Sequence, residues 1–291
     1  AERAPPCSVT TPLSPELPGA RRVRFGDNAE QGETRMTAND DFVPSIPSDV
    51  IDALERAKRV VAFTGAGISQ ESGVPTFRDA QSGLWARFSP EELATPEAFR
   101  KNPAQVWEWY AYRRGLVARA EPNPGHRALV ELARRVPELT LITQNVDGLH
   151  QRAGSHDVVE LHGNIATTKC FDEDSIVSEY AETGAVPPRC PRCGGLLRPG
   201  VVWFHESLPA AALERAMEST RRAEVFFSIG TSTVVYPAAE LPFIARDHGA
   251  FVVEINPEAT PLSVHAHHSL RGASGAILPA IVRALAARAP S

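Results

Sequence analysis

The chain has 291 residues, of which 43% are hydrophobic and 22% charged, and a formal net charge of -5. This composition is typical of a soluble globular protein with a main core and a small additional module. The negative charge gives no support for nucleic-acid binding, and no apolar run reaches the ~20 residues that a membrane-spanning helix needs. We expect a cytoplasmic monomer without nucleic-acid or membrane partners.

The first 45 residues are rich in Pro, Ser, Thr and Gly and have few apolar positions. Such a segment cannot bury enough apolar surface to offset the entropy of ordering it. We therefore predict a disordered tail over residues 1–45 and a folded domain over residues 46–291. The folded domain should begin with a helix that Ser48 caps and that continues to about Lys58.

After that helix, apolar strands alternate with helices. The strands are expected at residues 60–64, 139–144, 157–161, 224–230 and 250–255, and the helices between them include 125–136, 210–222 and 237–248. This alternation predicts an α/β fold, in which a Rossmann-like parallel sheet carries helices on both faces. Four residues lie at or just past the ends of predicted strands: Gly65, Gln144, Gly230 and Asn256. They should meet at one edge of the sheet, where ligands of such sheets bind.

The segment Gly65-Ala66-Gly67 directly follows the apolar run 60–64. Glycine lets the backbone approach a pyrophosphate closely, so this junction indicates a nucleotide site. The third glycine of the ordinary dinucleotide fingerprint is missing, because Gln70 holds its place and a polar loop with Pro75 is expected to follow. No acidic ribose-binding residue stands clearly about 20 residues further on, which also disfavours a dehydrogenase.

Two insertions interrupt the alternation and should form a smaller lobe. The first is helical and rich in aromatic residues, and the second contains three of the four cysteines. The small lobe is predicted at about 81–124 and 165–199, and the large nucleotide-binding lobe at about 46–80, 125–164 and 200–291.

Several short blocks follow one another in a characteristic order. They are Gly65–Asp79, Thr143–His150, Leu161-His162-Gly163, a cysteine cluster, Val201–Phe204, Gly230-Thr231-Ser232 and Ile255–Glu258. In this order and spacing they closely resemble the sirtuins, which are NAD-dependent protein lysine deacylases. The resemblance extends from about Val60 to Leu285. It implies that the chain uses NAD as a co-substrate, acts on acylated lysines of proteins and releases nicotinamide, free lysine and O-acyl-ADP-ribose. An NAD hydrolase or an ADP-ribosyltransferase that uses the same pocket is the alternative.

The resemblance also implies roles for individual residues. His162 corresponds to the general base, and a neutral imidazole can accept a ribose hydroxyl proton at physiological pH; an isolated histidine here would otherwise be read as a buried residue bonded to backbone. Asn145 and Asp147 are implied to line the nicotinamide pocket and so to take part in catalysis. The further NAD-binding positions are Gly65, Ala66, Gly67, Ser69, Thr76, Phe77, Arg78, Gln144, Gly230, Thr231, Ser232, Asn256, Glu258 and Ser274.

Tyr110 and Arg113 lie three residues apart on a predicted helix and therefore share a face. Tyr-x-x-Arg at this point resembles the desuccinylase-type (class III), bacterial-like sirtuins, in which the pair recognises the distal carboxylate of succinyl-, malonyl- or glutaryl-lysine. The planar fork of arginine suits a carboxylate, and Ala94 matches the small residue of that subgroup's acyl pocket. The alternative is a solvated helix face, which adjacent arginines usually form.

The acylated peptide is expected to lie extended along Val202, Trp203 and Phe204, opposite Pro237-Ala238, as an added strand. Sirtuins usually have Phe-Gly-Glu here, but this chain has His205 in place of the glycine. The His205 side chain either narrows the peptide groove or points to solvent.

The cysteine cluster departs from the family pattern. Cys190 and Cys193 have the spacing of a zinc knuckle, in which two thiolates reach one tetrahedral ion. Cys170 supplies a third thiolate, but Glu173 stands where sirtuins usually have a fourth cysteine. Three alternatives stay open: zinc bound by three thiolates and Glu173, zinc bound by three thiolates with water or Asp172, and a degenerate site. A redox-active Cys-x-x-Cys is less consistent with the Pro- and Gly-rich surroundings.

Two other histidine segments carry weaker signals. The run His265-Ala266-His267-His268 resembles a metal-binding tract by composition, but we expect a solvated loop. His126 lies at the start of a predicted helix and is expected to pack or to cap that helix rather than to catalyse.

Overall fold

The computed structural model describes residues 44–75, 88–181 and 183–288. The predicted tail, apart from residues 44 and 45, lies outside these ranges. Thr76, Phe77 and Arg78, which the sequence places at the nucleotide, lie outside them as well.

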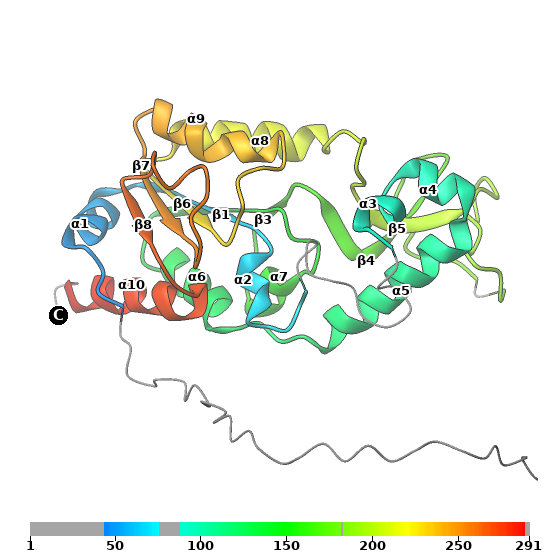
Figure 1. The fold of residues 1–291 in the computed structure, drawn as a ribbon, viewed down its shortest axis with the longest axis horizontal. Coiled ribbons are helices and arrows are strands. Elements are labelled where there is room, and N and C mark those ends of the chain that lie inside the picture. The colour runs from blue at the N-terminus through cyan, green and yellow to red at the C-terminus, as the bar shows by residue number, and fades with distance from the viewer. Residues whose placement is uncertain (1–43, 76–87, 182, 289–291) are drawn as a thin grey trace, which may run out of the picture. The chain divides into compact units, whose positions relative to one another are not determined.

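A six-stranded sheet, in the order β3-β2-β1-β6-β7-β8, forms the main layer of the described domain (Figure 1). Every neighbouring pair is parallel. The strands are β1 (Arg59–Thr64), β2 (Glu138–Thr143), β3 (Val158–Glu160), β6 (Val225–Ile229), β7 (Phe251–Ile255) and β8 (His268–Leu270). The α/β fold and the five predicted strands are therefore confirmed, with ends that differ by one or two residues.

The expected solvated loop at residues 265–268 holds for 265–267, where His265 and His267 are exposed, but His268 begins the edge strand β8. His268 pairs with Val253 in the sheet register. His267 accepts a hydrogen bond from the backbone N–H of Val252 and stacks on Phe251 at a centroid distance of 4.6 Å. The segment is short and mostly polar, so its strand character comes from pairing with β7 and not from an apolar pattern.

Helices cover both faces of the sheet (Figure 1). One face carries α1 (Ser48–Arg56), α6 (Pro124–Ala133) and α10 (Ser274–Arg288), and the other carries α8 (Ala210–Arg222), the 3-10 helix η2 (Ala238–Glu240) and α9 (Leu241–Asp247). Along β1, Val60 and Ala62 face the first helical layer, while Val61 and Phe63 face the second. This alternation follows from the two-residue repeat of a strand and explains why the whole run is apolar.

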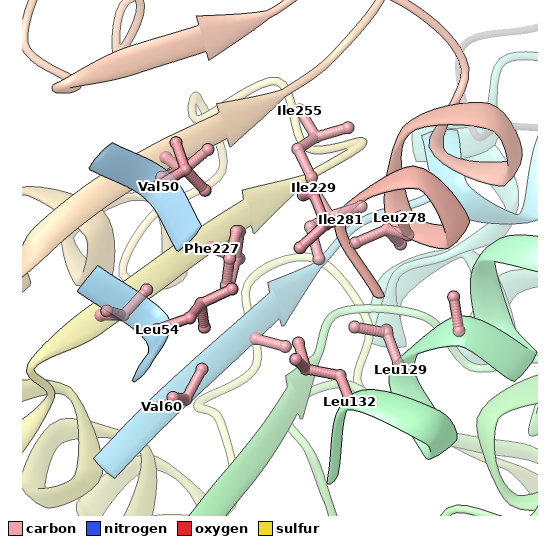
Figure 2. Packing of buried hydrophobic residues seen from close by; sticks show 14 of the residues in the cluster. Val50, Leu54, Val60, Leu129, Leu132, Phe227, Ile229, Ile255, Leu278 and Ile281 are labelled. Atoms are coloured by element: carbon pink, nitrogen blue, oxygen red, sulfur yellow. The ribbon is translucent and has the colours of Figure 1, made fainter. Parts of the chain in front are cut away.

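The first layer packs tightly against the strands. Figure 2 shows Leu54 of α1, Leu129 of α6 and Leu278 of α10 gathered with Phe227 and Ile229 of β6. Each of these side chains is at most 2% exposed, and burial of such a side chain stabilises the fold by roughly 1.5–3 kcal/mol. This core holds the strand ends in place for the site described below.

Helix α1 begins differently from the prediction. Ser48 is the first helical residue, and Pro47 occupies the N-cap position with φ -57° and ψ 138°. No side chain caps this end, and the backbone N–H of Val50 instead donates to the carbonyl of Pro47. The extended ψ of Pro47 ends the preceding segment, so no capping hydroxyl is required.

The two insertions have their own core. They contain α3 (Pro90–Leu93), α4 (Pro96–Lys101), α5 (Pro103–Arg119) and an antiparallel pair of strands, β4 (Gly163–Cys170) and β5 (Leu197–Val201). Phe99, Trp109 and Trp203 are each at most 2% exposed within it. Across all described residues, no helix is both long enough and apolar enough to span a membrane.

Candidate active site

The carboxyl ends of the central strands come together as predicted. The chain leaves β1 toward β2 on one side, whereas β6 lies on the other side of β1, so the strand order reverses between β1 and β6. Gly65 donates its backbone N–H to Ile229 (2.9 Å), and Gly67 donates to Gly230 (2.8 Å). A reversal of this kind leaves a crevice outside the strand ends, which is the usual ligand site of open α/β sheets.

The glycines at this edge are required by contact between the two loops. A Cβ on Gly65 would lie 2.8 Å from the carbonyl oxygen of Gly230. Gly230 has a φ of +59°, and its Cβ would lie 2.4 Å from the amide nitrogen of Ile68. A one-turn helix, α2 (Gly67–Gln70), begins directly at the second glycine, which corrects the expectation that only a polar loop follows.

Asn145, Asp147 and Ser69 form one buried hydrogen-bonded group. The side-chain amide of Asn145 donates to the carbonyl of Gly65 (3.0 Å) and to Ser69 Oγ (3.2 Å), and Ser69 Oγ donates to Asp147 Oδ2 (2.8 Å). Asp147 Oδ1 accepts from the backbone N–H of Leu149, at the start of α7 (Leu149–Ala153). Burial raises the pKa of the Asp147 carboxyl. The three predicted residues therefore lie together, with Asp147 within the reach of a ligand that approaches the strand ends.

Two buried histidines that the motif analysis did not place in the site lie behind this group. His126 Nε2 is 3.5 Å from Ser69 Oγ, and His150 Nε2 is 2.9 Å from Thr64 Oγ1. Burial lowers the pKa of His126 to about 4 and that of His150 to about 3. His126 also completes a capping box with Asn123 at the start of α6, which confirms its expected capping role.

His162 lies after β3, where the chain turns into β4. Its Nδ1 is 2.9 Å from the carbonyl oxygen of Gln144. Since a carbonyl can only accept, Nδ1 carries the proton and Nε2 is the free basic nitrogen. Burial lowers the pKa of His162, although the bond to Gln144 opposes this. A half-buried neutral imidazole with a defined tautomer can act as a base.

The other predicted nucleotide residues line the same edge. Gln144 Nε2 donates to Thr231 Oγ1 (2.9 Å), and Asn256 Nδ2 donates to the Thr231 carbonyl (2.9 Å). Ser232 is half-buried beside them, and Glu258 is exposed in the loop after β7. Ser274 is the first residue of α10. Its Oγ donates to Glu71 Oε1 (3.1 Å), which links the N-terminal end of α10 to the segment after α2.

Among the predicted acyl and peptide residues, Ala94, Tyr110, Arg113 and Trp203 are buried, whereas Val202 is half-buried and Phe204 is 37% exposed. Tyr110 and Arg113 share one face of α5 and are 3% and 8% exposed. Ala94 is buried, and its carbonyl accepts a hydrogen bond from the backbone N–H of Phe204 (2.9 Å). Trp203 Nε1 donates to Tyr110 Oη (3.0 Å). Tyr110 and Arg113 are both buried, which contradicts the alternative of a solvated helix face at these two positions. The exposed face of α5 instead carries Tyr112, which is 37% exposed.

The segment after β5 is hydrogen-bonded to the residue expected to act as the base. The backbone N–H of Val202 donates to the carbonyl oxygen of His162 (2.9 Å). His205, which follows, has φ +69° and a side chain 76% exposed. The backbone thus keeps a conformation that glycine adopts readily, while the imidazole points to solvent.

The cysteine cluster has the composition and the spacing of a metal site. Single ligand atoms from Cys170, Glu173, Cys190 and Cys193 all lie within 4.8 Å of one another. The sulfurs of Cys170 and Cys193 are 3.4 Å apart, close to the roughly 3.8 Å expected between two thiolates on a tetrahedral zinc. The backbone N–H of Cys193 lowers the pKa of the Cys190 thiol, whereas the neighbouring sulfurs of Cys170 and Cys190 outweigh the backbone N–H of Gly195 and raise that of Cys193. The thiols therefore compete for ionisation, and a bound cation would favour the thiolate forms. The cluster could therefore bind a structural zinc.

The fold and the strand-end site define a nucleotide-binding α/β protein in which His162 lies beside the strand ends. Residues 65–237 match the Sir2 family, and the chain belongs to that family. It is 59% identical over 205 residues to an NAD-dependent protein deacylase of Aquifex aeolicus (strain VF5), and the match covers 70% of this chain and 85% of that protein.

Solved structures agree with this assignment. A crystal structure of a Sir2 homologue in complex with NAD superposes with a TM-score of 0.77 and 46% identity, covering 84% of this chain and 95% of that chain. A mutant Sir2 bound to a deacetylated p53 peptide and 3′-O-acetyl ADP ribose has a TM-score of 0.73 and 32% identity, covering 81% and 97%.

Proposed function

We propose that this chain, an NAD-dependent protein deacylase, preferentially removes succinyl and malonyl groups from protein lysines and also removes acetyl groups. The proposed products are nicotinamide, free lysine and O-acyl-ADP-ribose. The coarser activity follows from the family, and acyl ADP ribose beside a deacetylated peptide in one similar structure supports the product assignment.

The observation that carries the acidic acyl preference is the burial of Tyr110 and Arg113 side by side on α5. Burial lowers the pKa of Arg113, yet a guanidinium stays protonated at neutral pH. A guanidinium at 8% exposure, which already lies over the Trp109 ring, offers several N–H donors and can bind a carboxylate in addition to its present contacts. A carboxylate at the end of an acyl chain matches both the fork of Arg113 and the hydroxyl of Tyr110, and Ala94 leaves room for the chain.

The catalytic role of His162 follows from its tautomer. Its Nδ1–H donates to Gln144, so Nε2 accepts the proton of a ribose hydroxyl. Burial lowers its pKa and keeps the imidazole neutral. NAD, when bound, supplies the ribose that accepts the acyl group and loses nicotinamide. Asn145 and Asp147 would hold the nicotinamide amide, because their side chains already converge at the strand ends.

The nucleotide edge fits NAD sterically. The loops after β1 and β6 meet through glycine backbone, with the Thr231 side chain beside Gly65, and such glycine backbone suits the close approach of a pyrophosphate. We assign phosphate and adenosine binding to the loop residues that the sequence indicated: Gly65, Ala66, Gly67, Ser69, Gly230, Thr231, Ser232, Asn256, Glu258 and Ser274. Cys170, Cys190, Cys193 and Glu173 would hold a structural zinc that fixes the outer end of the β4–β5 pair and takes no part in the reaction.

The orientation of His205 favours deacylation over NAD hydrolysis or ADP-ribosyl transfer. Because its side chain is 76% exposed, it does not fill the groove beside Val202 and Trp203. An extended peptide can therefore lie along this segment toward Pro237-Ala238. Product analysis separates the activities, since the alternatives yield free ADP-ribose or modified protein.

The test compares the removal of succinyl and acetyl groups from one lysine peptide at saturating NAD. Arg113→Met should lower kcat/KM for the succinyl peptide about 100-fold, which corresponds to a charged hydrogen-bonded contact of about 3 kcal/mol. His162→Ala should lower kcat on both peptides by at least about 100-fold.

The matched control is Arg114→Met. The Arg114 side chain donates to the carbonyls of Ile165 and Thr167 in β4, so its loss should not change the ratio of succinyl to acetyl activity. A wild-type preference for acetyl, together with no effect of Arg113→Met, would show that the acyl assignment is wrong. NAD consumption without free lysine would favour the hydrolase.

A further inference from the structure

Arg198 is the most deeply buried cation among the described residues. It lies on β5 at 2% exposure, and no motif assigned it a role. A buried guanidinium is costly unless its donors are paired. Its fork donates to both carboxylate oxygens of Glu206, through Nη1 to Oε1 and through Nη2 to Oε2 (2.9 Å). This two-point pairing fixes the guanidinium plane as well as its position.

The Arg198–Glu206 pair holds Trp203 from two sides. Arg198 Nη2 also donates to the carbonyl oxygen of Val201 (2.9 Å), and Glu206 Oε2 accepts the backbone N–H of Trp203 (2.7 Å). The guanidinium carbon lies 3.3 Å from the centroid of the Trp203 ring. The backbone before Trp203, its own amide and its indole face are therefore all set by one ion pair.

Trp203 in turn sets the hydroxyl of Tyr110. The indole Nε1–H, which can only donate, donates to Tyr110 Oη at 3.0 Å. Tyr110 therefore uses a lone pair toward Trp203, and its own O–H proton is directed to a different acceptor. A carboxylate can only accept, so this arrangement gives the phenol the donor role that an acidic acyl chain requires.

We propose that Arg198 is a positioning residue for acyl-chain selectivity, acting through Trp203 to present the Tyr110 hydroxyl as a donor to the distal carboxylate. The inference rests on the proposed preference for acidic acyl groups. It predicts that loss of Arg198 affects succinyl-lysine and spares acetyl-lysine, because the acetyl group has no carboxylate to contact Tyr110.

The experiment measures kcat and KM for succinyl- and acetyl-lysine versions of one peptide. Arg198→Met should raise KM for the succinyl peptide about tenfold, with kcat and both acetyl constants within about twofold of wild type. Arg198→Lys keeps a charge near the indole but lacks the fork, so it should recover part of the loss. Trp203→Phe keeps a ring and removes the N–H donor. Because Trp203 also borders the proposed peptide segment, this variant is judged only by the ratio of succinyl to acetyl kcat/KM, which should fall as in Arg198→Met.

A purely structural role would lower both activities equally, and that result would overturn the inference. Arg114→Met is the matched control, because this arginine also bonds buried backbone and lies near an indole ring, that of Trp107. If Arg198→Met does not fold, Arg198→Met/Glu206→Gln removes the unpaired carboxylate and tests the same contact.

Two further variants separate this inference from the proposed function. If Tyr110→Phe and Arg113→Met lose the succinyl preference while Arg198→Met and Trp203→Phe keep it, only the positioning role of Arg198 is wrong. If the wild type has no succinyl preference, both are wrong.

A spectroscopic measurement gives an answer that does not depend on activity. In protein labelled with ¹⁵N-tryptophan, Trp203→Phe identifies the Trp203 indole resonance. Both Arg198→Met and Tyr110→Phe should shift that resonance, and Arg114→Met should leave it in place. An unchanged Trp203 resonance in Arg198→Met would contradict the inference.

Discussion

The nucleotide edge of the sheet and the acyl side of the insertions are built by different means. At the nucleotide edge, backbone meets backbone, with Gly67 donating to Gly230 across two loops. On the acyl side, Arg198, Trp203 and Tyr110 transmit position from one side chain to the next. At the nucleotide edge, a Cβ added to Gly65, Gly67 or Gly230 would overlap the facing backbone. On the acyl side, the arrangement of the side chains depends on hydrogen-bond direction and charge.

This difference separates the two kinds of specificity in one enzyme. A site built from backbone recognises a pyrophosphate whatever the rest of the ligand is. It requires only that no side chain blocks the approach to the glycines. A relay of side chains can be retuned by one substitution without disturbing the sheet. This chain's departures from the family pattern, Glu173 and His205, both lie in or next to the insertions.

The largest effect is expected at the nucleotide edge. Gly230→Ala should lower the free energy of unfolding by about 4 kcal/mol, because the new Cβ would overlap the Ile68 amide at 2.4 Å. Gly73→Ala is the control, since Gly73 has a φ of +75° but none of the described residues lies within 4 Å of its Cβ. It should cost only about 1 kcal/mol. Equal costs in urea denaturation would mean that backbone contact does not constrain this edge.

Acid should weaken the region behind the nucleotide edge next. The folded chain holds His126 and His150 neutral down to pKa values of about 4 and about 3, whereas the unfolded chain binds these protons near pH 6.5. Protonation therefore favours unfolding, and stability is lost as the pH falls below 6.5. The free energy of unfolding should drop by about 3 kcal/mol between pH 7.5 and 5.5.

A variant assigns this pH dependence. His150→Gln should reduce the slope, as measured by urea denaturation across the same pH range. A slope in His150→Gln equal to that of wild type would show that other groups are responsible. The region of Trp203, by contrast, should contribute little over this range.

The metal cluster should respond more weakly to loss of its oxygen ligand. Removing a residue that only hydrogen-bonds a metal ligand already lowers metal affinity about 10–100-fold. Glu173→Ala, which removes a proposed ligand, should therefore lower zinc affinity at least about tenfold. Competition with a chromogenic chelator measures this affinity. Glu173→Cys should raise it, because structural sites prefer sulfur. Glu179→Ala is the control in the same module. Wild-type affinity in Glu173→Ala would assign the fourth position to water or Asp172.

The smallest expected effect is a gain at the peptide segment. His205 holds φ +69°, which costs an L-residue roughly 1 kcal/mol that glycine does not incur. His205→Gly should therefore raise the melting temperature by a few degrees and leave peptide KM unchanged. Asp174→Gly, also at positive φ (51°), should gain less, since aspartate tolerates this region and pairs there with Lys169. A changed peptide KM in His205→Gly would place the imidazole in the groove.

The sequence predicted the sheet and the strand-end residues well, because both depend on local patterns. Apolar runs mark buried parallel strands, and the residue after each run lies at the ligand edge. β8 was missed because its residues are polar and it exists only through pairing with β7. Arg198, Glu206 and the pair His126–His150 were missed as site neighbours for a different reason. Arg198 lies only eight residues from Glu206, but its link to the site passes through Trp203 to Tyr110, 93 residues away. The two histidines contact Ser69 and Thr64, which are 57 and 86 residues away, and no spacing rule indicates such contacts.

The bond between the Val202 amide and the His162 carbonyl has a consequence for how the two substrates affect each other's binding. His162 bonds Gln144, and Gln144 bonds Thr231, so one continuous series of contacts joins the proposed peptide segment at Val202 to the loop after β6. By thermodynamic linkage, whatever factor the bound peptide applies to the dissociation constant of NAD, bound NAD must apply to that of the peptide. The two substrates are in this sense each other's effectors.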